Sequence, residues 1–291
     1  MKKIEYIYDI LLKNLNIKNA SIIPIGGMTN ANYKIMSETN SYVLRIPGEG
    51  IKDLISRKNE YFNMQQIQNL GLDATLFYFD EKSGVKITKY IENAETLNPK
   101  TAWIYRKKVA DILRRFHSSD ICFINTFDVF REILRYENKI QSKIEEKLEN
   151  YGEIRKKVFL LQEELDKMGR KLTACHNDTV AENFVLGKEK IYLIDWEYSG
   201  MNELEWDLAA FSLENQFDQE QTKEFLEIYF EGKITEENRK KILIYQICQD
   251  FLWTLWTVLK EEHGENFGDY GKIRYQRALH LLEVMEYEYR N

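Results

Sequence analysis

Cysteine and proline are scarce in this chain of 291 residues, with three of each, and glycine occurs only 14 times. The cysteines are odd in number and widely spaced, and no Cys-x-x-Cys occurs, so neither a disulfide framework nor a zinc cluster is expected. Low proline and glycine together with 13% aromatic residues exclude a disordered, collagen-like or low-complexity protein. The cysteines are therefore expected to be small buried side chains in a reducing cytosol.

An excess of basic residues and a long apolar run are also missing. Lys plus Arg number 41 against 47 Asp plus Glu, a net charge of −6, which argues against a nucleic-acid binder. A single basic residue can nevertheless hold a nucleotide phosphate. No uncharged apolar run approaches the ~18–20 residues of a membrane span, and Glu5 and Asp9 interrupt any apolar signal segment at the N-terminus. We therefore expect a cytoplasmic protein without membrane insertion.

The periodicity of apolar residues predicts a small β-rich lobe followed by a larger helical lobe. In the first lobe it predicts helices over 2–15 and 53–70, and strands at 21–25, 32–36, 41–46, 76–79 and 85–90. After a polar connection near 91–93, it predicts helical segments at 99–117, 127–168 and 203–291, interrupted by a β-rich island at 172–195. The expected fold class is α+β, with residues 1–91 and 92–291 as its two domains.

The segment 175–195 carries the strongest chemical signal. A short apolar strand is followed by His176 and Asp178, then by Asn183, and a predicted hairpin ends at Asp195. This H-x-D-x₄-N spacing, with a strand-terminal Asp seventeen residues after Asp178, matches the catalytic loop and metal aspartate of kinases. Phosphoryl transfer needs one carboxylate that orients the attacking hydroxyl and accepts its proton, and oxygen ligands that hold magnesium on the phosphates.

We therefore predict that Asp178 is catalytic and that Asn183 and Asp195 are metal ligands, with ATP and Mg²⁺ as cofactors. His176 is predicted to brace the loop by hydrogen bonding rather than to act as a base. A loop that carries only capping Asp and Asn residues is the structural alternative.

At these residues the sequence resembles the aminoglycoside phosphotransferase/choline kinase superfamily and, within it, the bacterial choline kinases, over nearly the whole chain. The resemblance implies a protein-kinase-like two-lobed fold and transfer of the ATP γ-phosphoryl group to choline. The chain departs from protein kinases because it has no G-x-G-x-x-G, no Arg in the H-x-D motif, and no A-P-E stretch after Asp195. Residues 195–197, Asp-Trp-Glu, replace D-F-G.

The expected nucleotide loop is the Gly-Gly-Met-Thr-Asn-Ala-Asn run at 26–32. Its glycines and small polar groups can approach phosphates, and we predict this role for Gly27, Thr29 and Asn30. By spacing alone this signal is weak, and a plain turn is the alternative. By fold analogy, the adenine is placed near the connection at 90–93.

Arg45 is the only cation of the strand 42–48, where the resemblance places the phosphate-binding cation. A guanidinium can grip phosphate oxygens through two hydrogen bonds. Glu60 on the next helix is its expected partner, although Arg57 or Lys58 could pair with Glu60 instead. An exposed strand arginine is the alternative for Arg45.

The predicted acceptor pocket is aromatic. Trp253 and Trp256 lie at i and i+3 on one helix face, which from spacing alone is also typical of core residues. The resemblance implies that Glu214, Trp253, Trp256 and Tyr270 surround a trimethylammonium group, with Tyr198 lining the same region. Such a group has no N–H to donate, and aromatic faces hold it with ~0.5–2 kcal/mol each.

Other acceptors and another protein class stay open at this point. Kinases for ethanolamine, a thiosugar, homoserine or an aminoglycoside would need more carboxylates and amides that accept hydrogen bonds, so choline is the predicted small-molecule partner. A non-catalytic pseudokinase that serves as a binding module is the second alternative. The presence of Asp178, Asn183 and Asp195 argues against it.

Overall fold

The computed structural model describes residues 2–27, 30–48 and 54–289, and its chain divides into two compact units. Unit 1 comprises Met1–Glu95 and Val185–Glu197, and unit 2 comprises Thr96–Phe184 and Tyr198–Asn291. The predicted boundary at 91 lies near the first division. A single boundary does not describe the chain, however, because the hairpin after residue 185 returns to unit 1, where Leu193 N–H donates to the carbonyl of Leu72 at 2.9 Å.

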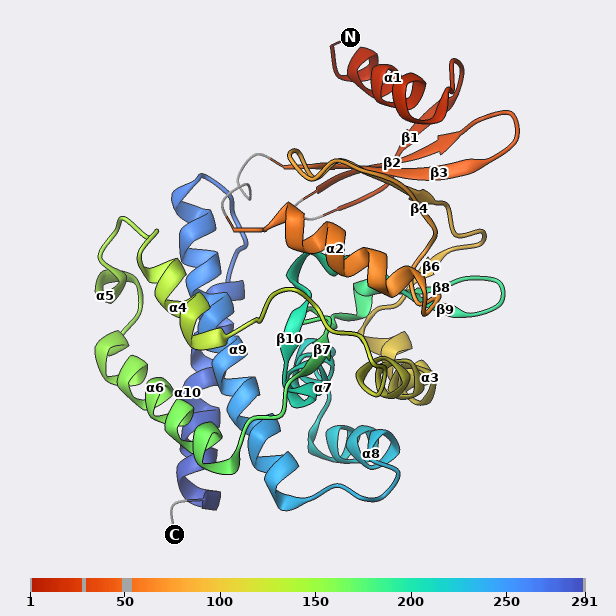
Figure 1. The fold of residues 1–291 in the computed structure, drawn as a ribbon. Helices are drawn as coiled ribbons and strands as arrows, with labels where there is room; N and C mark the ends of the chain where they lie inside the picture. The colour runs from red at the N-terminus through yellow and green to blue at the C-terminus, as the bar shows by residue number, and fades with distance from the viewer. Residues whose placement is uncertain (1, 28–29, 49–53, 290–291) are drawn as a thin grey trace. The chain divides into compact units, whose positions relative to one another are not determined.

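Unit 1 is built around a five-stranded antiparallel sheet in the order β1-β2-β3-β5-β4. Figure 1 shows α1 above these strands and α2 below them. Ile7 and Leu11 of α1 form one core cluster with sheet residues such as Leu44 and Ile87. The elements of unit 1 are α1 (Lys2–Leu15), β1 (Ser21–Pro24), β2 (Asn30–Met36), β3 (Ser41–Pro47), α2 (Arg57–Gln68), β4 (Leu76–Phe79), β5 (Lys86–Lys89) and β9 (Ile191–Leu193). The divisions between the units fall within β6 (Glu95–Thr96) and β8 (Phe184–Leu186).

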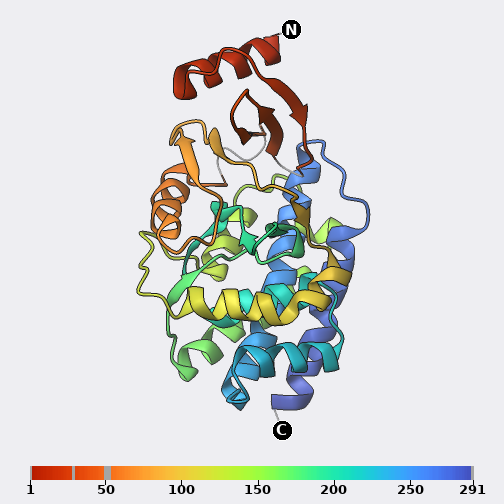
Figure 2. The same ribbon diagram turned by 90° about the vertical axis from the view of Figure 1, so that its right-hand side faces the viewer.

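Unit 2 is mainly helical, with one short antiparallel pair formed by β7 (Thr173–Cys175) and β10 (Gly200–Asn202). The helices α9 and α10 run side by side, which the two blue helices in Figures 1 and 2 show. The helices are α3 (Pro99–His117), α4 (Val129–Glu137), α5 (Ile144–Lys147), α6 (Tyr151–Met168), α7 (Leu204–Glu214), α8 (Gln219–Tyr229), α9 (Glu236–Glu262) and α10 (Tyr270–Tyr289).

The predicted elements exist, with three differences. The helical segment predicted over 127–168 is divided into α4, α5 and α6, because Asn150 adopts a left-handed φ of 56° and the chain between α4 and α5 leaves the helix. The strands β6 and β10 were not predicted, since each is only two or three residues long. The first residues of the helix predicted from 53 lie partly outside the described residues, and α2 begins at Arg57, after the N-cap Ser56.

Helix α9 is the core helix of unit 2. It is long and apolar enough to span a membrane by length and composition, and 83% of its most apolar window is buried inside the fold. Thr235 caps its N-terminus by accepting the N–H of Asn238, and the Asn238 side chain accepts in return from the backbone of Thr235. The burial of α9 agrees with a helix that other helices of the same unit surround.

Candidate active site

The loop after β7 carries Asp178 with its carboxylate half-buried, between neighbours that are buried. The amide nitrogen of Asn183 donates to the carboxylate of Asp178 at 2.9 Å and to its carbonyl oxygen at 2.7 Å. Asn183 sits at the end of a short 3₁₀ turn, Ala181–Asn183, which directs it back to Asp178. Two of the predicted site residues are thus brought into direct contact, and the Asn183 amide oxygen is the atom of that side chain suited to a metal ion.

Asp207 of α7 anchors this loop. Its carboxylate accepts the backbone N–H groups of His176 and Asn177, both at 2.8 Å, and contacts His117 Nε2 at 3.0 Å. Asn177 has a left-handed φ of 65°, so the anchorage holds an unusual backbone in place. Sequence reasoning missed Asp207, although an acid inside the apolar run 206–211 is a signal that could have found it.

The buried histidines near this loop are structural. The ring Nδ1 of His176 accepts the backbone N–H of Asp178 at 3.3 Å, in agreement with the predicted bracing role. His117 contacts the Tyr229 hydroxyl at 2.8 Å and Asp207 at 3.0 Å. Although His117, Cys175 and Asp207 lie close enough to bind a metal ion together, the histidine nitrogens and the carboxylate are already hydrogen-bonded.

In unit 1, Glu60 is shared by three cations. Arg45 Nη1 lies 2.6 Å and Lys86 Nζ lies 3.2 Å from Glu60 Oε1, while Arg57 Nη1 lies 2.7 Å from Oε2. Arg45 is 3% exposed, so the alternative of an exposed strand arginine is wrong. Arg57 pairs with Glu60 in addition to Arg45, whereas Lys58 is exposed.

Asp195 lies beside the same cations with part of its carboxylate accessible. Its Oδ1 is 3.2 Å from Arg45 Nη1 and 3.8 Å from Lys86 Nζ, and its side chain is 31% exposed. Its backbone adopts a left-handed φ of 67°, which is rare for a residue with a side chain and common at functional sites. An accessible carboxylate oxygen of this kind fits a magnesium ion.

The ion cluster shifts the pKa values of its members. Burial alone would lower the pKa of the Arg45 guanidinium, but the charges of Glu60, Asp195 and Glu197 outweigh burial and raise it. Burial alone would raise the pKa of Glu60, but Arg45, Lys86 and Arg57 outweigh burial and lower it. These residues therefore stay ionised while buried.

Glu197 and Lys86 complete the cluster and were not predicted as site residues. Glu197 lies 3.0 Å from Arg57, and its pKa is raised by burial and by the charge of Asp195. Lys86 is the direct cross-strand partner of Arg45 in the β3–β5 register, so both side chains point to the same face of the sheet. The pairing of strands forty residues apart, which no local pattern encodes, is what joins Lys86 to this site.

The predicted nucleotide loop is only partly described. Gly27 has a φ of 145°, and a Cβ atom on it would lie 2.2 Å from the carbonyl oxygen of Asn30, so glycine is required there. Asn30 donates to Glu197 at 3.4 Å, and its side-chain oxygen is buried without a hydrogen-bond partner among the described residues. The prediction for Thr29 falls outside the described residues.

Three predicted substrate residues form one aromatic cluster in unit 2. The ring of Trp253 meets that of Tyr198 edge-on at 5.4 Å and that of Trp256 edge-on at 6.4 Å. Trp253 is half-buried, whereas Trp256 is only 6% exposed and also packs on Phe267 at 4.9 Å. Trp253 therefore offers more accessible ring surface than Trp256.

Glu214 and Tyr270 form a second group, joined by an arginine that was not predicted. Arg274 is 3% exposed, its Nη2 donates to both carboxylate oxygens of Glu214, and its guanidinium lies 4.4 Å from the Tyr270 ring centre. The predicted role of Glu214, to lie beside a trimethylammonium group, stays a prediction. The structure adds that the charge of Glu214 is compensated by Arg274.

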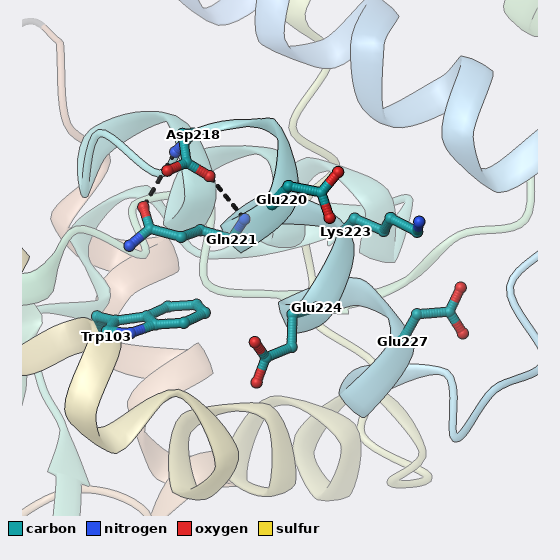
Figure 3. Close-up of a pocket in the computed structure, with 7 residues that line it drawn as sticks. All are labelled: Trp103, Asp218, Glu220, Gln221, Lys223, Glu224 and Glu227. Carbon is teal, nitrogen blue, oxygen red and sulfur yellow. Dashed lines mark hydrogen bonds between the residues drawn. The ribbon is translucent and has the colours of Figure 1, made fainter.

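Two hollows, each of about 320 Å³, lie away from most predicted site residues. One is lined by Trp103 and by acidic residues of α8, as Figure 3 shows, and no predicted site residue lines it. The other lies in unit 1 at the β2–β3 turn and includes Tyr90 and Glu92 of the predicted connection. One face of the Tyr90 ring is covered by the Lys34 ammonium at 3.8 Å.

Comparison with known proteins identifies the family. The sequence profile of the choline/ethanolamine kinase family matches residues 22–243. Protein LicA of Haemophilus influenzae is 37% identical over 271 residues, which cover 89% of this chain and all of that one.

Two solved structures are similar over nearly the whole chain. The structure of choline kinase LicA from Streptococcus pneumoniae matches with a TM-score of 0.89 and 38% identity, covering 98% of this chain and 100% of that one. A LicA structure in complex with AMP matches with a TM-score of 0.87 and 38% identity, covering 97% and 98%. The predicted protein-kinase-like fold is thereby confirmed, and the chain belongs to the choline/ethanolamine kinase family.

Proposed function

We propose that this ATP-dependent phosphotransferase transfers the γ-phosphoryl group of ATP to the hydroxyl group of choline, giving phosphocholine and ADP. The observation that carries the choice of acceptor is the aromatic cluster of Tyr198, Trp253 and Trp256. The carboxylate predicted for the same site, Glu214, is already paired with Arg274. Such surroundings suit a cation without N–H donors. The similarity to a choline kinase over nearly the whole chain supports the same acceptor.

In this proposal Asp178 orients the choline hydroxyl and accepts its proton as the oxygen attacks phosphorus. The carboxylate is half-buried, and the amide of Asn183 fixes its direction through a hydrogen bond of 2.9 Å. Asp207 holds the backbone of the same loop. A general base that is positioned in this way typically contributes a factor of about 10²–10⁴ to the rate.

We assign Mg²⁺ to the oxygens of Asn183 and Asp195, an assignment that follows from the motif spacing and from their hard oxygen donors. Magnesium held by these residues would neutralise charge on the phosphates. Arg45 and Lys86, both beside Asp195, are the cations of unit 1 that we assign to the ATP phosphates, and Glu60 keeps them in place. Gly27, Thr29 and Asn30 are assigned to the phosphate loop on the same grounds.

The proposal is tested by coupling ADP release to a visible assay with choline, ethanolamine, a thiosugar and an aminoglycoside as acceptors. We expect choline to have the highest kcat/KM. A higher kcat/KM for any other acceptor would contradict the choice of choline while leaving the phosphotransferase intact. The cytoplasmic location stays a prediction, which fractionation of the source cells tests.

A further inference from the structure

Arg274 forms an ion pair with Glu214, the carboxylate of the predicted cation site. Its Nη2 donates to both oxygens of Glu214, its Nη1 donates to Asp250 at 3.0 Å, and its guanidinium covers one face of Tyr270 at 4.4 Å from the ring centre. Since Glu214 lies on α7, Asp250 on α9 and Tyr270 on α10, this one buried side chain ties three helices together.

This group is held against the helix segment that carries both tryptophans. Asp250, Trp253 and Trp256 follow each other at intervals of three residues on α9, so Trp253 is a neighbour of both Asp250 and Trp256 on the helix surface. Gly271, the residue after Tyr270, accepts a hydrogen bond from Thr254 at 3.2 Å, and a Cβ atom on Gly271 would lie 2.9 Å from Thr257. The start of α10 therefore packs directly on the tryptophan-bearing part of α9.

The ion pair between Arg274 and Glu214 takes up part of the hydrogen-bond accepting capacity of Glu214. A primary ammonium carries N–H donors that are bonded to water in solution and need new acceptors once it is enclosed. Both oxygens of Glu214 already accept from Arg274, whose charge compensates that of the carboxylate, so Glu214 attracts such an ammonium less than an unpaired carboxylate would. A trimethylammonium group has no N–H donors and needs no hydrogen-bond acceptor, so the pairing of Glu214 with Arg274 does not weaken its binding in this way.

Building on the proposed function, we propose that Arg274 is a specificity-determining residue, which makes the site prefer a quaternary ammonium to a primary one by engaging Glu214. Arg274 acts through Glu214 and is therefore a positioning residue. A purely structural role would lower activity with all acceptors alike, whereas this role changes their ratio.

The test measures kcat/KM for ethanolamine, its N-methyl and N,N-dimethyl derivatives and choline, a series in which each step replaces one N–H donor by a methyl group. In the wild type we expect kcat/KM to rise with each methyl group. In Arg274→Met, which frees Glu214, we expect the ratio of choline to ethanolamine to fall about tenfold or more, as one hydrogen bond to a charged group is gained by the primary amine. Arg274→Lys keeps the charge but only part of the hydrogen bonding, so its ratio should lie between these two.

Arg277→Met is the matched control. Arg277 lies on the same helix and also binds Asp250, at 2.6 Å, but it makes no ion pair with Glu214 among the described residues. We expect its ratio to stay within about twofold of the wild type. Each ratio is measured within one preparation, so a reduced folded fraction cancels.

Two outcomes are distinguishable. A wild type that prefers choline, together with an unchanged ratio in Arg274→Met and Arg274→Lys, overturns the role of Arg274 alone. A wild type that prefers ethanolamine overturns the proposed function as well. If Arg274→Met does not fold, an unchanged ratio in Arg274→Lys is sufficient to overturn the inference.

Discussion

The ion cluster around Glu60 in unit 1 and the loop after β7 in unit 2 are held in different ways. In unit 1, Arg45, Arg57 and Lys86 surround Glu60, and charges of opposite sign compensate one another. In unit 2, the carboxylate of Asp207 holds the catalytic loop through backbone N–H groups. The cations that we assign to the ATP phosphates repel one another, so anions must lie between them. A loop, by contrast, needs only hydrogen-bond acceptors for its buried N–H groups.

This difference predicts which substitutions should change the reaction kinetics and which should change the free energy of unfolding. A single substitution in the cluster of unit 1 leaves several buried charges unbalanced. The groups of unit 2 that we assign to chemistry, such as Asp178 and Trp253, keep part of their surface accessible. Their removal should therefore change turnover or substrate affinity more than folding.

Asp178→Asn should have the largest effect. We expect kcat to fall by about 10³-fold, because the amide cannot accept the hydroxyl proton. The KM for ATP should change little, since the side chain keeps its shape. The measurement is steady-state ADP release, with Asp218→Asn, an N-cap substitution that preserves capping, as the control at wild-type turnover. Near-normal turnover would refute the role of Asp178.

Glu60→Gln should have the next largest effect and tests the compensation in unit 1. Three cations lose their shared carboxylate, so the free energy of unfolding should fall by about 3–5 kcal/mol. Urea unfolding measures it. Glu95→Gln, at an exposed position, should stay within about 0.5 kcal/mol of the wild type. Equal stabilities of the two variants would contradict the view that Glu60 holds the cluster.

Trp253→Ala tests the aromatic cluster of unit 2. We expect the KM for choline to rise about tenfold, in line with ~1–2 kcal/mol for one cation–π contact, while the KM for ATP stays within about twofold. Trp103→Ala is the matched control, because Trp103 is also a half-buried tryptophan of unit 2 and lines the hollow of Figure 3. If both KM values rise equally in Trp253→Ala, Trp253 is a core residue.

Glu262→Gln should have the smallest effect on the free energy of unfolding. Glu262 is held mainly by hydrogen-bond donors, whereas Glu60 is held by cations, so the two variants compare these two ways of holding a carboxylate. Partial burial acts to raise the pKa of Glu262, but the hydrogen bonds from Ser142 and the backbone of Gln141 lower it to about 2. The folded pKa lies below the unfolded one, so this stability is present above about pH 4.5 and is lost as the pH falls toward 2.

We expect the variant to be about 1 kcal/mol less stable at pH 6, with a difference that shrinks as the pH falls. Urea unfolding at several pH values between 3 and 6 measures it. A difference that does not depend on pH would show that the charge of Glu262 contributes nothing.

Much of the fold and the chemistry could be predicted because they depend on local patterns. The H-x-D-x₄-N spacing and the strand before Asp195 identified the reaction, and the family comparison confirms the enzyme class. The break of the helix at Asn150 could not be predicted from periodicity, because it depends on a left-handed residue within a charged helical pattern.

The sequence by itself determined the type of reaction, the order of the elements and the residue types that bind a phosphate or a cation, because these depend on neighbours within a few residues. Only the tertiary structure decided that Lys86 joins Arg45, that Asp207 holds the catalytic loop, and that Arg274 occupies Glu214. These contacts join residues 30 to 60 positions apart, so their partners are chosen by strand register and helix packing. Whether a predicted carboxylate is free or paired is thus a property of the fold.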